Sequence, residues 1–178
     1  MRNKVSILAL ICAFTFMSCT QTKPCETPTN GFLTDTDFQV KMGSSAAVDV
    51  FNQFDAAWAK RDYETLKTFI ADEASLSFDD GFVATTPQEF VDKIKADAAE
   101  STTEGGNSWV TNYAFALTLT DDGSEETTID SGDWVNAQFT TTSTDPDSEI
   151  GSEIYYEYYH IVDGKVTQWN QFKKTIKK

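Results

Sequence analysis

The spacing of apolar residues changes near Gly106, and this change divides the chain into a helical part and a strand part. Before it, apolar residues recur every three or four positions, as Val48, Phe51, Phe54 and Trp58 do. This period predicts helices over residues 44–62, 62–74 and 85–100. The third helix has the clearest start, because Thr86, Pro87 and Glu89 fit an N-cap, a first-turn proline and a capping box. The segment 75–84 predicts two short strands around an Asp-Gly turn.

After Gly106 the period is two. Alternating apolar and polar residues predict strands within 109–119, 128–142, 149–162 and 165–176. Asp163-Gly164 predicts a two-residue turn between the last two strands. Helices followed by a four-strand antiparallel meander are typical of the α+β class, with the helices on one face of a curved sheet.

The first residues differ from the rest and predict a targeting segment. Arg2 and Lys4 precede an apolar run over residues 5–17 that is too short to span a bilayer, and Cys19 follows it. This pattern resembles a bacterial lipoprotein signal, which implies a signal peptide over 1–18, lipidation of Cys19, a flexible tether over 19–43 and a domain over 44–178. An ordinary cleaved signal with an incidental Cys19 is the alternative. Thr20 after the cysteine implies a cell-envelope protein anchored by lipid in the outer membrane.

Charge and rare residues exclude several classes of function. The net charge is −14, and loss of the two cations in residues 1–18 makes it −16. Fifteen acidic residues and no Lys or Arg lie between Lys95 and Lys165, so a nucleic-acid partner is excluded. A single histidine and few cysteines exclude a disulfide framework and a zinc site. The acidic segment 145–153 lacks the glycine and glutamate positions of an EF-hand loop, and no metal or cofactor is expected.

Two segments carry a family resemblance. "AWAKRDYETLKTFIADEASLSF" over 57–78 and "YYHIVDGKVTQWNQF" over 158–172 resemble the SnoaL-like, nuclear transport factor 2-like superfamily. The resemblance implies a cone, in which a strongly curved antiparallel sheet wraps around three N-terminal helices. It also implies a pocket at the open end of the cone and, in many members, a homodimer through the outer face of the sheet.

The hairpin register assigns residues to the two faces of this sheet. If Val162 pairs with Lys165, then His160, Tyr158 and Tyr156 share a face with Trp169 and Gln171. The resemblance implies that this face is the pocket wall, which Phe54 and Trp58 complete from the first helix. The other face would carry Tyr159 and form the dimer surface. The alternative, that these aromatic side chains fill the cone as core, stays open.

Two functions follow from this assignment. The first is a membrane-anchored binding or accessory domain whose aromatic-lined pocket holds a small apolar or amphipathic molecule. The alternative is an isomerase- or hydrolase-type enzyme that uses Asp79 and His160 as an acid–base pair. By resemblance, Phe54, Phe78 and Gln171 occupy places where related enzymes carry catalytic tyrosine or carboxylate groups, which argues against those chemistries.

Overall fold

The computed structural model of the chain describes residues 29–34, 37–100, 109–120 and 132–178. The predicted signal peptide, the lipidation site at Cys19 and the first part of the tether lie outside these residues. No helix within the described ranges has the length and apolar character needed to cross a membrane.

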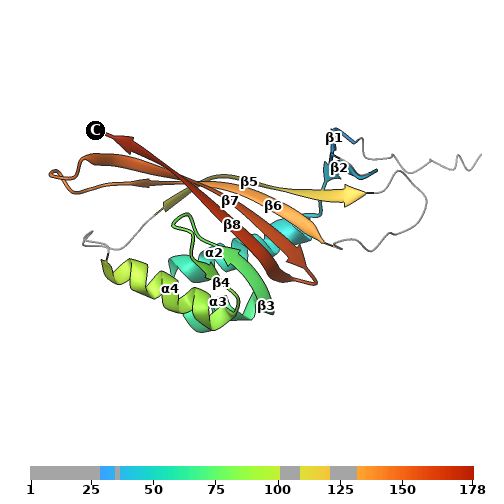
Figure 1. The fold of residues 1–178 in the computed structure, drawn as a ribbon, viewed down its shortest axis with the longest axis horizontal. Coiled ribbons are helices and arrows are strands. Elements are labelled where there is room, and N and C mark those ends of the chain that lie inside the picture. The colour runs from blue at the N-terminus through green and yellow to red at the C-terminus, as the bar shows by residue number, and fades with distance from the viewer. Residues whose placement is uncertain (1–28, 35–36, 101–108, 121–131) are drawn as a thin grey trace, which may run out of the picture.

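The described strands form one curved sheet, and the helices all lie against one of its faces (Figure 1). The strand order is β1-β2-β5-β6-β7-β8-β3-β4. The strands are β1 (Gly31–Phe32), β2 (Gln39–Met42), β3 (Ile70–Ser77), β4 (Val83–Ala84), β5 (Trp109–Thr120), β6 (Asp133–Thr142), β7 (Ile150–Val162) and β8 (Lys165–Lys177). The meander β5–β8 is antiparallel as expected, but β3 runs parallel to β8. The sheet is therefore mixed, and the prediction of an all-antiparallel sheet was wrong.

The helices are α2 (Ser45–Ala59), α3 (Tyr63–Thr68) and α4 (Pro87–Glu100). Ser44 and Asp62 cap α2 and α3 by accepting hydrogen bonds from Ala47 N (3.2 Å) and Thr65 N (3.2 Å). At α4, Thr86 Oγ1 accepts from Glu89 N, while the Glu89 carboxylate accepts from Thr85 N at 2.7 Å. The cap expected at Thr86 therefore sets the start of α4, although Glu89 reaches one residue further back than a standard capping box.

The second helix is shorter than predicted because tertiary pairing replaces its last part. Residues 70–74 form the start of β3, where Ile70 pairs with Val166 of β8. Lys165 Nζ donates to the carbonyl of Thr68 (3.0 Å), which satisfies an acceptor at the end of α3. Ile70, which lies within the predicted helix, reaches the core from a strand.

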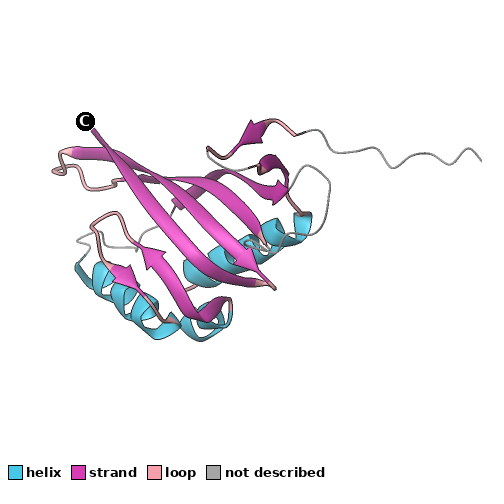
Figure 2. Ribbon diagram, turned by 45° about the vertical axis from the view of Figure 1, so that its right-hand side comes forward, coloured by secondary structure: helices cyan, strands magenta, loops and turns pink. Residues whose placement is uncertain are grey.

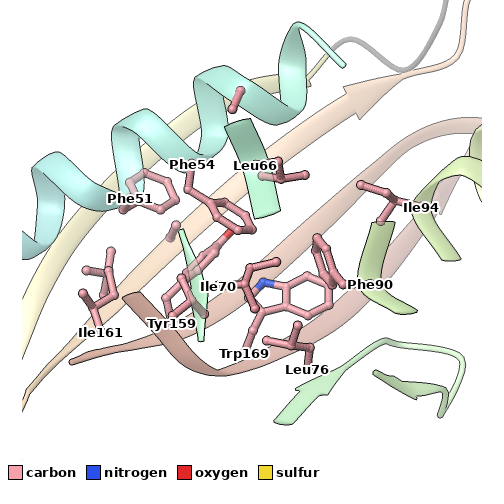
Figure 3. Close-up of a cluster of buried hydrophobic side chains, with 14 of the residues drawn as sticks. Phe51, Phe54, Leu66, Ile70, Leu76, Phe90, Ile94, Tyr159, Ile161 and Trp169 are labelled. Carbon is pink, nitrogen blue, oxygen red and sulfur yellow. The ribbon is translucent and has the colours of Figure 1, made fainter. Parts of the chain in front are cut away.

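The sheet begins before the boundary predicted at Ser44. Strand β2 pairs with β5, with Val40 opposite Leu119 and Met42 opposite Leu117. Part of the predicted tether therefore continues the sheet at its β5 edge. The core lies between the sheet and the helices, and Phe51, Phe54, Phe90, Tyr159 and Trp169 meet there (Figure 3).

A bulge in the last hairpin decides which residues face this core. The turn is as predicted, with positive φ at Asp163 (49°) and Gly164 (77°). Val162 pairs with Lys165 and Ile161 with Val166, but His160 pairs with Gln168, so Thr167 is an extra residue in β8. Beyond the bulge, Tyr159 lies opposite Trp169 and Glu157 opposite Gln171.

The predicted register was therefore off by one residue, and it placed β7 with the wrong face inward. Tyr159 is 1% exposed in the core, and it does not lie on the outer face where the sequence reading put it. Tyr156, Tyr158 and His160 lie on the outer face. Trp169 and Gln171 face inward as predicted. Figure 2 shows the twist that carries the long β7–β8 hairpin across the helices.

Candidate functional site

A cavity of about 690 Å³ lies between the inner face of the sheet and helices α2 and α4. Its walls include aromatic side chains from both layers, among them Trp58, Trp109, Phe139 and Tyr155. The exposed residues Ala59, Arg61, Asp80 and Asp97 also line it, so the cavity reaches solvent.

The buried end of the cavity holds the Glu157 carboxyl group, which is 5% exposed. Trp169 Nε1 donates to it at 3.1 Å, Gln171 Nε2 donates at 2.8 Å, and the Tyr159 hydroxyl donates a third hydrogen bond. Burial raises the pKa of Glu157 above its ordinary value, and the nearby charge of Asp55 raises it further, against the effect of the three donors. Glu157 is thus a carboxyl group held in place in a cavity whose walls combine aromatic and polar side chains.

A second carboxyl group, Asp55, enters the cavity from α2. Trp109 Nε1 donates to Asp55 at 2.8 Å, and Thr111 Oγ1 donates at 3.3 Å. Partial burial raises the pKa of Asp55, again against the hydrogen bonds that lower it. The donors in these bonds to Asp55 and Glu157 are all neutral groups. The carboxylates nearer the mouth of the cavity are instead paired with lysine.

Those outer carboxylates are paired with lysine. Lys173 Nζ lies 2.9 Å from Asp79 and 3.7 Å from Glu153, and Glu153 also accepts from the Tyr155 hydroxyl at 3.0 Å. Burial and the Glu153 charge raise the pKa of Tyr155 well above its usual range, so Tyr155 stays a hydrogen-bond donor. Lys93 makes a similar pair with Asp80 (2.7 Å) on the α4 side.

The predicted binding residues are divided between three places. Trp58 and Gln171 line the cavity. Phe54 and Trp169 lie in the core beside it, where Trp169 reaches the site through its bond to Glu157. Tyr156, Tyr158 and His160 lie on the opposite face of the sheet because of the Thr167 bulge. The sequence reading placed these three side chains in the pocket wall, but the cavity lies on the other face of the sheet.

The predicted acid–base pair is not assembled. Asp79 lines the cavity and is paired with Lys173. His160 is buried on the outer face, where its ring stacks on Trp134 with centroids 4.6 Å apart, and its Nδ1 lies 3.0 Å from Thr167 Oγ1. The sequence reading placed His160 beside Tyr158 or Trp169, but Trp169 lies in the core opposite Tyr159. The sheet therefore separates the two members of the proposed pair.

Sequence reasoning missed Glu157 and Asp55. Glu157 stands in an aromatic strand and was assigned to the outer face by the register error. Asp55 lies off the apolar stripe that Val48, Phe51, Phe54 and Trp58 form on the first helix, so the spacing did not mark it as buried. One signal was available for Glu157. It is a charged residue flanked by Tyr155, Tyr156, Tyr158 and Tyr159, and a carboxyl group buried among such residues needs hydrogen-bond partners. Within the described ranges, no three or more His, Cys, Asp or Glu side chains are grouped to hold a metal ion.

Comparisons with known proteins support the fold. No protein-family profile matches the chain, and no curated protein matches it. Solved structures do: a proposed ketosteroid isomerase from Kribbella flavida is similar over 77% of this chain and 84% of its own length, with 9% identity and a TM-score of 0.53.

Two further structures are described as NTF2-like proteins. One, of unknown function, comes from Mesorhizobium loti (14% identity, TM-score 0.51, covering 74% of this chain and 93% of its own). The other comes from Burkholderia xenovorans (11% identity, TM-score 0.50, covering 75% and 92%). At these identities the likeness establishes the α+β, cone-like fold, and function has to be argued from the cavity.

Proposed function

We propose, from the nuclear transport factor 2-like fold of this chain and from the geometry of its cavity, that the domain holds a small amphipathic molecule. The apolar part of the molecule would lie against Trp58, Trp109 and Phe139. Its polar part would reach the carboxyl groups of Glu157 and Asp55 and the amide of Gln171. Aromatic contact surface combined with polar groups at fixed positions is typical of a small-molecule site.

The observation that carries this proposal is the burial of Glu157. Taking a carboxyl group out of water costs free energy even when it is hydrogen-bonded, and apolar side chains in place of both Glu157 and its donors would fill the same space without that cost. The chain instead arranges three donors around Glu157 at the end of a cavity that solvent reaches. A polar contact for a bound molecule accounts for this arrangement.

An isomerase- or hydrolase-type enzyme is the second candidate, and it now rests on other residues. The Asp79–His160 pair is separated, but Glu157 and Asp55 share one cavity and both have raised pKa values. Carboxyl groups perturbed in this way are typical of acid–base sites. Turnover of a bound molecule that is lost in both Glu157→Gln and Asp55→Asn, with binding retained, would favour this candidate.

The cavity can be tested as a binding site by filling it. Ala98 lines the cavity from α4, whereas its neighbour Ala99 is exposed and does not. We expect the neutral fluorescent probe N-phenyl-1-naphthylamine to bind the chain and its Ala99→Trp variant equally. Ala98→Trp should weaken binding about tenfold, a loss of about 1.4 kcal/mol. Equal binding by both variants in a fluorescence titration would place the probe outside the cavity and contradict the proposal.

We also propose that this domain is anchored by lipid on Cys19 at the outer membrane, from the pattern of the first residues. Two or more acyl chains on one residue give stable membrane attachment. Cys19→Ser should therefore move the protein from the membrane fraction to the soluble fraction and abolish labelling by a fatty-acid analogue. Cys25→Ser is the matched control and should change neither. Unchanged membrane partitioning of Cys19→Ser would refute the anchor.

The outer face of the sheet remains the proposed dimer surface, with different residues from those first assigned. Tyr113, Phe115, Tyr158 and Phe172 expose large rings, and Phe172 is 58% exposed. An isologous contact would bury a charge introduced there. Phe172→Glu should therefore shift the chain toward monomer in sedimentation velocity, and Phe82→Glu, at an exposed ring in the β3–β4 turn, should not. A native chain that is already monomeric at high concentration would contradict the dimer.

A further inference from the structure

The side chains that line the cavity carry more negative than positive charge. Three cationic residues line it, Arg61, Lys93 and Lys173, against seven acidic ones: Asp55, Asp79, Asp80, Asp97, Asp145, Glu153 and Glu157. Arg61 lies exposed in the turn that follows α2, with φ of 56°. Compensation of the negative charge inside the cavity therefore depends on the two lysines.

Both lysines form ion pairs with the outer carboxylates. Lys93 Nζ lies 2.7 Å from Asp80 and 2.6 Å from Asp97. Lys173 lies between Asp79 and Glu153. Among the described residues, neither Asp55 nor Glu157 forms an ion pair, and their hydrogen-bond donors are indole, hydroxyl and amide groups. The deeper part of the cavity thus holds acceptors for a positive charge that no cationic side chain supplies.

The aromatic walls are suited to the same charge. An ammonium group within about 6 Å of a ring centroid is attracted by the negative face of the ring. The cavity already places its own cations in this way, since Lys93 Nζ lies 5.3 Å from the centroid of Phe78 and Lys173 Nζ lies 5.9 Å from that of Tyr155. Trp58 and Trp109 lie edge to face with ring centroids 5.9 Å apart, and Trp109 donates a hydrogen bond to Asp55.

We infer that the molecule held in this cavity is an organic cation, an arylalkyl- or alkylammonium whose charged head lies beside Asp55 and the indole rings of Trp58 and Trp109. This inference rests on the proposed function, because it names the class of molecule that the cavity binds. The ammonium N–H groups would donate to the Asp55 carboxylate, and the apolar part would lie along Phe139 toward Tyr159. A cation is also attracted to the Asp55 carboxylate by its full positive charge, which a neutral molecule of the same shape lacks, so Asp55 would give selectivity for a cation.

Three probes with one phenethyl skeleton separate charge from shape: phenethylamine is a cation at neutral pH, 2-phenylethanol is neutral, and 3-phenylpropionate is an anion. Isothermal titration of the full chain gives the three affinities, and the same titration of Ala98→Trp, in which cavity binding is weakened, shows whether each probe binds in the cavity. We expect phenethylamine to bind about tenfold more tightly than 2-phenylethanol, and 3-phenylpropionate to bind most weakly, because an anion meets uncompensated carboxylates.

Variants of Asp55 locate the selectivity. Asp55→Asn keeps an acceptor for Trp109 and removes the charge, so it should bring the affinity for phenethylamine to within about threefold of that for 2-phenylethanol, with a much smaller change for the alcohol. Asp55→Glu keeps the charge and should keep the preference for the amine. A preference retained in Asp55→Asn would overturn the placement of the charged head at Asp55.

The two proposals fail in different ways in this experiment. If 2-phenylethanol binds in the cavity as tightly as phenethylamine, the inference of a cation is wrong and the proposed binding function stands. Tightest binding of 3-phenylpropionate also overturns the cation and points to Lys93 and Lys173. If none of the three probes binds the chain more tightly than it binds Ala98→Trp, both proposals are contradicted.

Discussion

Trp169→Ala is expected to lower the free energy of unfolding by about 3–5 kcal/mol, the range measured for truncation of large aromatic side chains in cores. Trp169 is fully buried and lies 4.8 Å from Phe78 and 5.3 Å from Phe90 between ring centroids. It also donates to Glu157, so alanine removes both packing and a hydrogen bond at the site. Urea unfolding followed by circular dichroism gives the loss.

Phe32→Ala is the control for this substitution. Phe32 is 79% exposed in β1, so its truncation should change the free energy of unfolding by less than about 0.5 kcal/mol. A Trp169→Ala variant no less stable than Phe32→Ala would contradict the placement of Trp169 in the core.

Glu157→Leu is expected to be less stable than Glu157→Gln by about 2–4 kcal/mol, because leucine leaves the indole N–H of Trp169 and the hydroxyl of Tyr159 buried without an acceptor. Glutamine offers an oxygen to both, and its amide can donate to Gln171 once that side chain is turned over. The two replacements are similar in size, so their difference reports hydrogen bonding at the buried end of the cavity. Chemical unfolding of both variants at one pH measures it.

The raised pKa of Glu157 also predicts how the stability of the chain depends on pH. The pKa of Glu157 is raised in the folded state, so the folded chain binds its proton more tightly than the unfolded chain does. The contribution of Glu157 to stability is therefore complete below its unfolded pKa of about 4.3, and it is lost as pH rises through the folded pKa. Asp55 acts in the same direction, whereas Asp62, Asp80 and Glu89 have lowered pKa values and act in the opposite one.

The difference between wild type and Glu157→Gln isolates the effect of this residue. We expect the variant to gain stability relative to wild type as the pH rises from about 4.5 to 8. Thermal unfolding of both chains across this range tests the sign. Parallel pH profiles would show that Glu157 titrates alike in the folded and unfolded chain, against its burial in the cavity.

Local signals predicted the parts of the fold that local chemistry determines. Thr86 caps α4, and the Asp163-Gly164 turn has the two positive φ angles that this pair favours. The parallel pairing of β3 with β8 had no such signal, because it joins segments nearly a hundred residues apart. The first residues of β3 were therefore predicted as the end of a helix, because their apolar spacing also fits a helical period.

The candidate site was only partly predictable because of one residue. Nothing in "KVTQWNQF" marks Thr167 as a bulge, since the bulge forms where β8 must pair with both β7 and β3. One extra residue turns the inward side of β7 outward. Trp169 and Gln171 were therefore placed on the correct face of the sheet. Glu157 was placed on the outer face and lies on the inner one, and the reverse holds for Tyr156, Tyr158 and His160.

The most direct test of the central claim, that the cone cavity binds a small molecule, uses the indole N–H signals of the chain's four tryptophans. Trp58 and Trp109 line the cavity, Trp169 lies in the core beside it, and Trp134 lies on the outer face against His160. The ¹⁵N-labelled chain is titrated with the phenethyl probe that binds most tightly, and each signal is assigned from a Trp→Phe variant. The account predicts saturable shifts of the Trp58 and Trp109 signals with Trp134 unchanged. A saturable shift of Trp134 with the Trp58 and Trp109 signals unmoved would place the molecule on the outer face and contradict it.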